Sequence, residues 1–170
     1  MSKWSASHKT ITPTATADAT NLVDSTYPFA IQGGSSTQRI NIFEFYLGGQ
    51  AGASSPTFMV VGRDSQVGSG ALTSDTNLMA QALDAATAAL AAPPTVFNKA
   101  ATNKPQRSTT LGGLLNLSFN AFGGIVRWVA APGEEISMVG QTASLGEISL
   151  SAFTGGTAGL FGAHMVYEPL

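Results

Sequence analysis

The residue types that carry most enzyme chemistry are few in this chain and far apart. The two histidines, His8 and His164, lie near opposite ends, and neither has a second histidine or a carboxylate at metal-ligand spacing. Cysteine is absent, which excludes disulfides and thiolate ligands. No serine stands in a Gly-x-Ser-x-Gly elbow, the turn that presents the nucleophile in many hydrolases. We therefore expect no metal, no cofactor and no catalytic residue, and we interpret His164 as a half-buried strand histidine.

One pair of adjacent carboxylates, Glu134 and Glu135, invites comparison with the acid–base pair of glycoside hydrolases. The pair follows the turn residues Pro132 and Gly133, where alternation along a strand would place the two side chains on opposite faces. This predicts a solvated hairpin rather than a catalytic pair. The Gly-rich stretches 48–52 and 155–159 lack the Lys-Ser/Thr of a phosphate-binding loop and predict turns.

The two tryptophans have different surroundings in the sequence. Trp128 has Val126 and Ala130 on its own side of a predicted strand, which favours a core position. Trp4 stands in a polar segment without apolar neighbours, and tryptophan is enriched among interface hot spots. Trp4 is therefore a candidate anchor into a partner protein. The other candidate partner contacts are the apolar residues Ile11, Leu22 and Val23 of the same N-terminal segment.

The low content of charged residues is the most informative property of the composition. Eight basic and ten acidic side chains make up 11% of the 170 residues, against about 25% in an ordinary soluble domain. We infer that part of the surface is covered by other protein, as in a subunit of an assembly. The net charge of −2 with no basic stripe gives no footprint for nucleic acid. No apolar run approaches the ~20 residues of a membrane span, and no secretory signal is recognisable, so we expect a cytoplasmic origin.

The pattern of apolar residues predicts a mainly β domain over residues 27–170, preceded by an extended arm over residues 1–26. The arm alternates threonine with small apolar residues, and we expect it to lie on another molecule, although a frayed terminus is the alternative. Beyond it, about eight strands alternate with Gly-rich turns, which predicts an antiparallel, jelly-roll-like sandwich. Residues 75–92 show helical spacing between Asp75 and Pro93-Pro94 and predict one short Ala-rich helix.

Two strands are predicted in more detail. Residues Arg39–Leu47 are apolar on both faces, which predicts a central strand covered on both sides. Residues Leu115–Ala121 alternate cleanly between apolar and polar side chains, which predicts a strand with one solvated face.

The hairpin Gly124–Ile136 and the ending Gly162–Glu168 are similar to segments of tailed-bacteriophage structural proteins. Together with the Thr-rich arm and the jelly-roll-like strand series, they resemble the capsid decoration (cement) proteins of these phages. The resemblance implies a homotrimer that binds the outside of the capsid, with the major capsid protein as its partner. It implies no enzyme activity, no membrane contact and a location on the virion surface.

Three other functions stay open at this point. A receptor- or carbohydrate-binding jelly roll of a tail fibre or spike needs exposed aromatic residues beside polar groups on loops. A major coat subunit of a small virus would suit the fold, but the chain lacks a basic arm for nucleic acid. A cupin-type enzyme lacks its metal histidines here.

Overall fold

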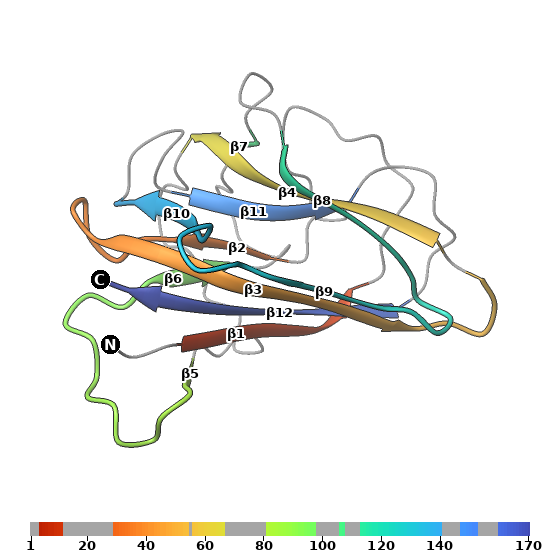
Figure 1. Cartoon of the computed structure of the whole chain (residues 1–170), viewed down its shortest axis with the longest axis horizontal. Coiled ribbons are helices and arrows are strands. Elements are labelled where there is room, and N and C mark those ends of the chain that lie inside the picture. Colours follow the sequence, from red (N-terminus) through yellow and green to blue (C-terminus); the bar gives the residue numbers. More distant parts are fainter. Residues whose placement is uncertain are drawn as a thin grey trace.

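The computed structural model describes residues 4–11, 29–54, 56–66, 81–97, 106–107, 113–140, 147–152 and 160–170 (Figure 1). These residues form strands, turns and loops, with no helix among them. All strand pairs within this part of the chain are antiparallel. The prediction of a mainly β, antiparallel domain is confirmed, with twelve described strands in place of the expected eight or so.

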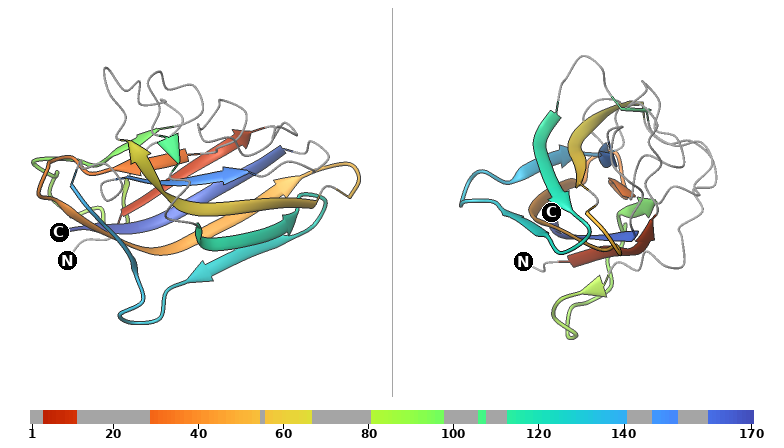
Figure 2. Two further views of the ribbon diagram at one scale, coloured as in Figure 1. Left: turned by 90° about the horizontal axis from the view of Figure 1, so that it is seen from above. Right: turned by 90° about the vertical axis from the view of Figure 1, so that its right-hand side faces the viewer.

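The strands form two six-stranded sheets, seen from further sides in Figure 2. Sheet A has the order β10-β3-β12-β1-β5, and β9 also pairs with β3. Its strands are β1 (Trp4–Ile11), β3 (Arg39–Gln50), β5 (Gln81–Ala82), β9 (Ile125–Val129), β10 (Ile136–Val139) and β12 (Leu160–Pro169). Sheet B has the order β6-β2-β11-β4-β7, and β8 also pairs with β4. Its strands are β2 (Phe29–Gln32), β4 (Pro56–Gln66), β6 (Thr95–Phe97), β7 (Gln106–Arg107), β8 (Gly113–Asn120) and β11 (Glu147–Ala152).

Apolar side chains of both sheets meet in one hydrophobic core. Phe45 and Tyr167 of sheet A and Met59 and Leu150 of sheet B belong to it, each at most 1% exposed. Arg63 of β4 also links the sheets by donating from Nη2 to the carbonyl oxygen of Ser137 in β10 at 2.9 Å. Burial lowers the pKa of Arg63. The two sheets are therefore held together by apolar burial and by at least one polar bridge.

Sheet B is buried on both faces at its centre. Met59 and Val61 of β4 face the core, and Val60 between them is also buried. In the neighbouring β11, Ile148 and Leu150 face the core and Ser149 is equally buried. A strand covered on both faces has no solvated side, as in the interior of a larger domain.

β3 is a central strand, as predicted, because β12 pairs with one of its edges and β9 and β10 with the other. A β-bulge corrects the further prediction that both faces of the strand are covered. Val166 of β12 pairs with Glu44 and Tyr167 pairs with Ile42, so Phe43 is the extra residue on β3. One extra residue reverses which side chains face the core. Both Ile42 and the later apolar residues of β3 consequently enter the same core, and Glu44 remains on the outer face.

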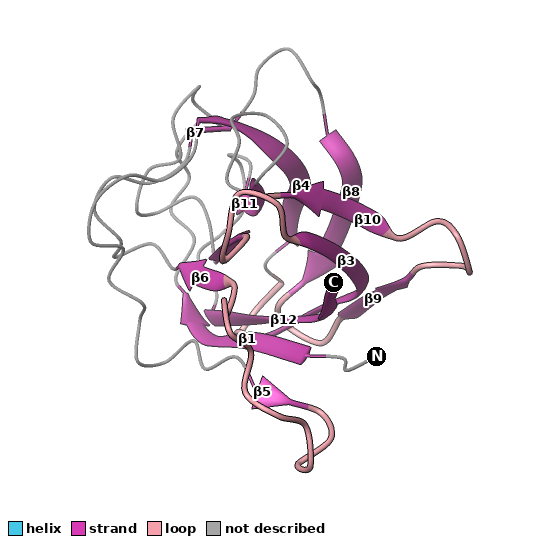
Figure 3. Ribbon diagram, turned by 90° about the vertical axis from the view of Figure 1, so that its left-hand side faces the viewer, coloured by secondary structure: helices cyan, strands magenta, loops and turns pink. Residues whose placement is uncertain are grey.

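The strands β9 and β10 do not form the predicted hairpin with each other. Both pair with the same edge of β3, β9 with residues 44–48 and β10 with residues 39–42. Between them Ala130 donates to the carbonyl oxygen of Phe43 at 2.8 Å. The intervening residues 130–135 project from the sheet as a loop (Figure 3). A turn from Ala131 to Glu134, with Gly133 at φ 87°, shapes the tip of this loop.

The predicted helix over residues 75–92 is absent from its described part, residues 81–92. Gln81 and Ala82 form β5, which pairs with β1. Asp84 then holds a turn, because its side chain accepts from the Ala86 amide at 2.9 Å and its carbonyl accepts from Thr87 at 3.0 Å. Such side-chain bonds compete with helix formation, and Leu83 of the expected apolar face is 59% exposed. Residues 75–80 lie outside the described residues.

The N-terminal arm is also placed differently from the prediction. Residues 4–11 are extended, but they form β1 within sheet A and pair with β12 of the same chain. Trp4 stands opposite Tyr167, and Ser7 stands opposite His164. The pairing satisfies the backbone groups along that edge of β12, which an edge strand leaves open. Residues 12–28, with Leu22, Val23 and the expected boundary at residue 26, lie outside the described residues.

Gln38 organises the end of the molecule where β3 begins. Its side-chain oxygen accepts from the Gly34 amide at 2.7 Å, and its side-chain nitrogen donates to the Ala92 carbonyl at 2.9 Å. Its backbone carbonyl accepts from the Gly140 amide at 2.6 Å. Gly140 has φ 64°, and a Cβ there would overlap the carbonyl group of Ser36. Three chain segments therefore approach closely at this end.

Candidate interaction surface

The outer face of sheet A, away from the core, carries the most distinctive side chains of the described structure. Three neighbouring strands, β9, β3 and β12, place their residues there in register. Val129, Glu44 and Val166 form one row across the sheet. Arg127, Tyr46 and His164 form the next, and Ile125 faces Gly48 in the third. We call the seven residues Ile125, Arg127, Val129, Glu44, Tyr46, His164 and Val166 the outer patch.

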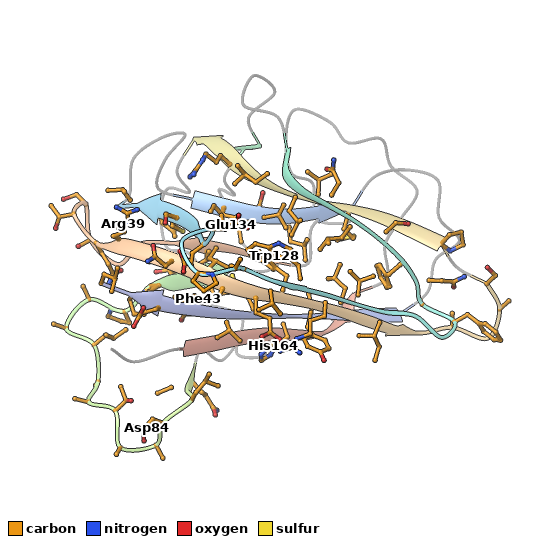
Figure 4. The ribbon with its side chains drawn as sticks, viewed as in Figure 1. Arg39, Phe43, Asp84, Trp128, Glu134 and His164 are labelled. Atoms are coloured by element: carbon orange, nitrogen blue, oxygen red, sulfur yellow. The ribbon has the colours of Figure 1, made fainter. Side chains whose placement is uncertain are left out.

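Alternation along β9 decides which of its side chains join the outer patch. Val126 and Trp128 pack against the core, and the Trp128 ring centroid lies 5.9 Å from that of Phe45. Trp128, which the sequence predicts to be a core residue, is partly buried and packs against the core from its rim. Figure 4 shows Trp128 and His164 on opposite faces of the sheet. His164 is half-buried, as the sequence predicts.

The outer patch exposes large apolar side chains. Ile125 is 71% exposed, Val129 is 52% exposed and Tyr46 is 36% exposed. Single exposed apolar residues are common on proteins, but neighbouring ones that form a patch indicate an interaction site. The outer patch is therefore a candidate surface for binding another protein.

A charged pair lies inside this apolar surface. Arg127 donates from Nε to Glu44 Oε1 at 2.9 Å and from Nη2 to Glu44 Oε2 at 3.1 Å. The guanidinium carbon also lies 5.4 Å from the centre of the Tyr46 ring, within cation–π range. The hydrogen bond from Arg127 is the main cause that lowers the pKa of Glu44, and the field of His164 acts in the same direction. The same pairing raises the pKa of Arg127.

A tight turn beside the outer patch adds one more exposed aromatic residue. Phe122, 60% exposed, lies in the connection from β8 to β9. Asn120 builds this turn, since its side-chain oxygen accepts from the Phe122 amide at 3.1 Å and its carbonyl accepts from Gly124 at 2.7 Å. The Asn120 amide group donates to Ser54 Oγ at 2.8 Å, which ties the turn to the loop after β3.

Three other possibilities were considered for the described part of the chain: a metal site, a pair of catalytic carboxylates and a membrane-spanning helix. No group of three or more histidine, aspartate or glutamate residues there could hold a metal ion. Glu134 is exposed on the projecting loop, and Glu135 Oε1 accepts from the Gly133 amide at 3.1 Å. This hydrogen bond stabilises the turn at Gly133. No helix among the described residues is long and apolar enough to cross a membrane.

The partner-binding residues predicted from sequence are not the residues of the outer patch. Trp4 and Ile11 lie at the two ends of β1, beside β12 in the same sheet, and Leu22 and Val23 are outside the described residues. Sequence reasoning missed Ile125, Arg127 and Val129. One signal was present, because an inward Trp128 requires its neighbours on the strand to face outward.

Comparison with known proteins adds no relative: no protein-family model matches this sequence, and no curated protein matches it.

Proposed function

We propose that this chain is a structural virion protein that binds the outside of a phage capsid and stabilises contacts between major capsid subunits. The observation that carries the proposal is the outer patch, an exposed apolar surface on a chain with 11% charged residues. Such a surface is characteristic of a protein that works within an assembly. The resemblance of Gly124–Ile136 and Gly162–Glu168 to phage structural proteins supplies the kind of assembly.

The finer description of the fold belongs to the same proposal. We propose that sheets A and B form a jelly-roll-like sandwich, since they share one core and successive strands pass between them. The chain changes sheet from β3 to β4 and again from β8 to β9. A decoration protein of this kind acts as a homotrimer without cofactor or metal.

Co-sedimentation with purified phage capsids tests the function. Capsids that carry the chain's cognate major capsid protein are mixed with the purified protein and pelleted, and the bound fraction is quantified. We expect saturable binding, and we expect capsids with the bound protein to survive heating to a higher temperature than capsids without it. Capsids of an unrelated phage serve as the control. Equal or absent binding to both would contradict the proposal.

A receptor- or carbohydrate-binding function is the second candidate. One observation favours it, because Tyr46 lies exposed beside the polar groups of Glu44, Arg127 and His164. Sugar rings stack on open aromatic faces, however, and the Arg127 guanidinium already lies over the Tyr46 ring. Glycan-array binding that disappears in Tyr46→Ala and persists in Leu83→Ala, a change at another exposed apolar residue, would favour this function instead.

A further inference from the structure

We propose that Arg39 and Arg63 form a binding site for an oxyanion, a phosphate or carboxylate group, at the corner where β10 meets sheet B. Arg39 is the first residue of β3 in sheet A, and Arg63 belongs to β4 in sheet B. Both side chains contact Ser137 of β10. The site lies outside the outer patch, and it does not rest on the proposed function.

Ser137 holds both guanidinium groups by hydrogen bonds to uncharged oxygen atoms. Arg63 Nη2 donates to the Ser137 carbonyl oxygen at 2.9 Å, and Arg39 Nη2 donates to the Ser137 hydroxyl at 3.4 Å. The hydroxyl in turn donates to Asn41 Oδ1 at 2.7 Å, which fixes its direction. β10 is the last strand of sheet A on this side, so its outer edge leaves backbone carbonyl groups for such contacts. Two cations from different sheets are therefore held beside one uncharged residue.

No carboxylate among the described residues neutralises either of these two arginines. Arg127 provides the contrast within the same chain, because both carboxylate oxygens of Glu44 accept hydrogen bonds from it. Arg39 and Arg63 each direct one of their five N–H groups to Ser137, which leaves donors on both for an oxyanion. The planar fork of N–H groups on arginine matches the oxygen atoms of carboxylate and phosphate groups.

Arg63 is a partly buried cation without a counter-charge in the described part of the chain. Burial lowers its pKa, and no carboxylate acts in the opposite direction. Removing a cation from water is costly unless a charged partner offsets the loss of hydration, and the Ser137 carbonyl offsets it only in part. A bound anion would supply the missing charge. Arg39 is exposed beside β10 (Figure 4), so it can reach the same anion from the solvent side.

The surrounding charges favour a single small anion over a polyanion. Glu135 lies two residues before Ser137, and Glu168 stands in the same row of sheet A, beyond Asn41. Together with a net charge of −2 on the whole chain, these carboxylates would repel the further charges of a nucleic acid or of a run of acidic residues. The ligand that fits is therefore one phosphate or carboxylate group held by both guanidinium groups.

An NMR titration with inorganic phosphate tests the site, with the backbone amide signals of Ser137 and Val139 as reporters. Potassium chloride holds the ionic strength constant, so that the screening of charges does not change during the titration. We expect saturable shifts of these signals in the wild type. Arg39→Gln and Arg63→Gln should each weaken the affinity for phosphate about tenfold, since each variant loses charged hydrogen bonds to the anion.

Leu83→Glu is the control, because it changes the net charge by the same one unit at an exposed residue on the loop after β5. Its affinity for phosphate should lie within about twofold of the wild type, since a distant exposed charge is screened by salt. Arg63→Gln also removes the bridge between the sheets, so far-UV circular dichroism is recorded for every variant. If Arg63→Gln does not fold, Arg39→Gln, a change at an exposed side chain, decides the test.

A parallel titration with acetate identifies the source of the oxyanion. Saturable binding of phosphate alone assigns the site to phosphate groups, and saturable binding of acetate assigns it to carboxylates, such as those of acidic side chains. Both results uphold the site. The absence of saturable binding with either ion would overturn the proposal, and so would equal affinities in the wild type and in the folded arginine variants. None of these outcomes depends on binding to capsids.

Discussion

At the scale of single residues, the outer patch depends on the pair formed by Glu44 and Arg127. The Glu44 side chain is only 17% exposed, although it stands on the outer face of the sheet. Two hydrogen bonds from Arg127 and the Tyr46 ring below the guanidinium fix the position of the pair. A fixed charge pair within an apolar surface restricts how a partner protein can dock, since the partner must place complementary groups opposite the pair.

The charge of Glu44 makes stability depend on pH. The pKa of Glu44 is lower in the folded chain than in the unfolded chain, mainly because Arg127 hydrogen bonds to the carboxylate. Its contribution to stability is therefore present above the unfolded pKa and lost as the pH falls through the folded pKa. In urea unfolding series between pH 7 and pH 3, we expect Glu44→Gln to lose less stability on acidification than the wild type.

Glu134→Gln is the control for this series, because Glu134 is exposed on the projecting loop. Its acid-dependent loss should equal that of the wild type. If the free energy of unfolding fell equally with pH in Glu44→Gln and in the wild type, the pair of Glu44 and Arg127 would not contribute to stability.

Tyr167 allows a second test at the same scale. Its hydroxyl is buried without a hydrogen-bond partner among the described residues, and burial raises its pKa. Removing an unpaired buried polar group costs no hydrogen bond. Tyr167→Phe should therefore be as stable as the wild type or more stable by up to about 1 kcal/mol in urea unfolding. Phe45→Ala, which leaves a cavity in the same core, should lose about 3–5 kcal/mol. If Tyr167→Phe lost as much stability as Phe45→Ala, the Tyr167 hydroxyl would have a hydrogen-bond partner after all.

At the scale of elements, strands with one solvated face could be predicted from the sequence, whereas a β-bulge within a strand could not. In β8, Leu117 and Phe119 are buried and Asn116 and Ser118 are exposed, as the alternation predicts. In β3 the sequence predicts the central position correctly and the facing of the side chains wrongly, because the bulge at Phe43 has no signature in the residue types around it. The β3 part of the outer patch was missed for this reason, since Glu44 follows the bulge directly.

The helix prediction failed for a different physical reason. Its apolar residues are mostly alanines, which bury little area, and a helix without packing is marginal in water. A turn at Asp84 and two residues of strand pairing were enough to replace the described part of it. The prediction that β9 and β10 form a hairpin was wrong. Turn residues show where the chain reverses, but they do not show which strand each of the flanking strands pairs with.

Gly133 and Gly140 both have a positive φ, but only Gly140 lies close to another part of the chain. Comparing the two positions distinguishes the cost of a left-handed backbone from the cost of a steric clash. Gly133 has φ 87° with open space where a Cβ would lie, whereas Gly140 has φ 64° and a Cβ there would overlap the Ser36 carbonyl. Gly133→Ala should lose about 1–2 kcal/mol, the cost of a left-handed conformation. Gly140→Ala should lose clearly more in the same unfolding assay. Equal losses would show that Ser36 moves aside without cost.

At the scale of the whole molecule, the first and last described strands hold each other in sheet A. β1 lies between β12 and β5, so removal of β1 would leave β12 as an open edge. Each backbone hydrogen bond contributes about 0.5–1.5 kcal/mol net, and a paired strand therefore contributes several kcal/mol.

Deletion of residues 1–11 tests this contribution. We expect a fall of several kcal/mol in the free energy of unfolding, with aggregation through the exposed edge. Deletion of residues 1–3 alone, which keeps β1 intact, should behave like the full chain. Urea unfolding and light scattering measure both effects. A stable, monodisperse product of the longer deletion would show that β1 contributes little to sheet A.

The loop of residues 130–135 has a practical consequence for engineering. Because β9 and β10 each pair only with β3 among the described residues, the connection between them sets the alignment of neither strand. Extra residues grafted between Pro132 and Gly133 would be accommodated without a register change on either side. This site is therefore suited to carry foreign epitopes or affinity tags.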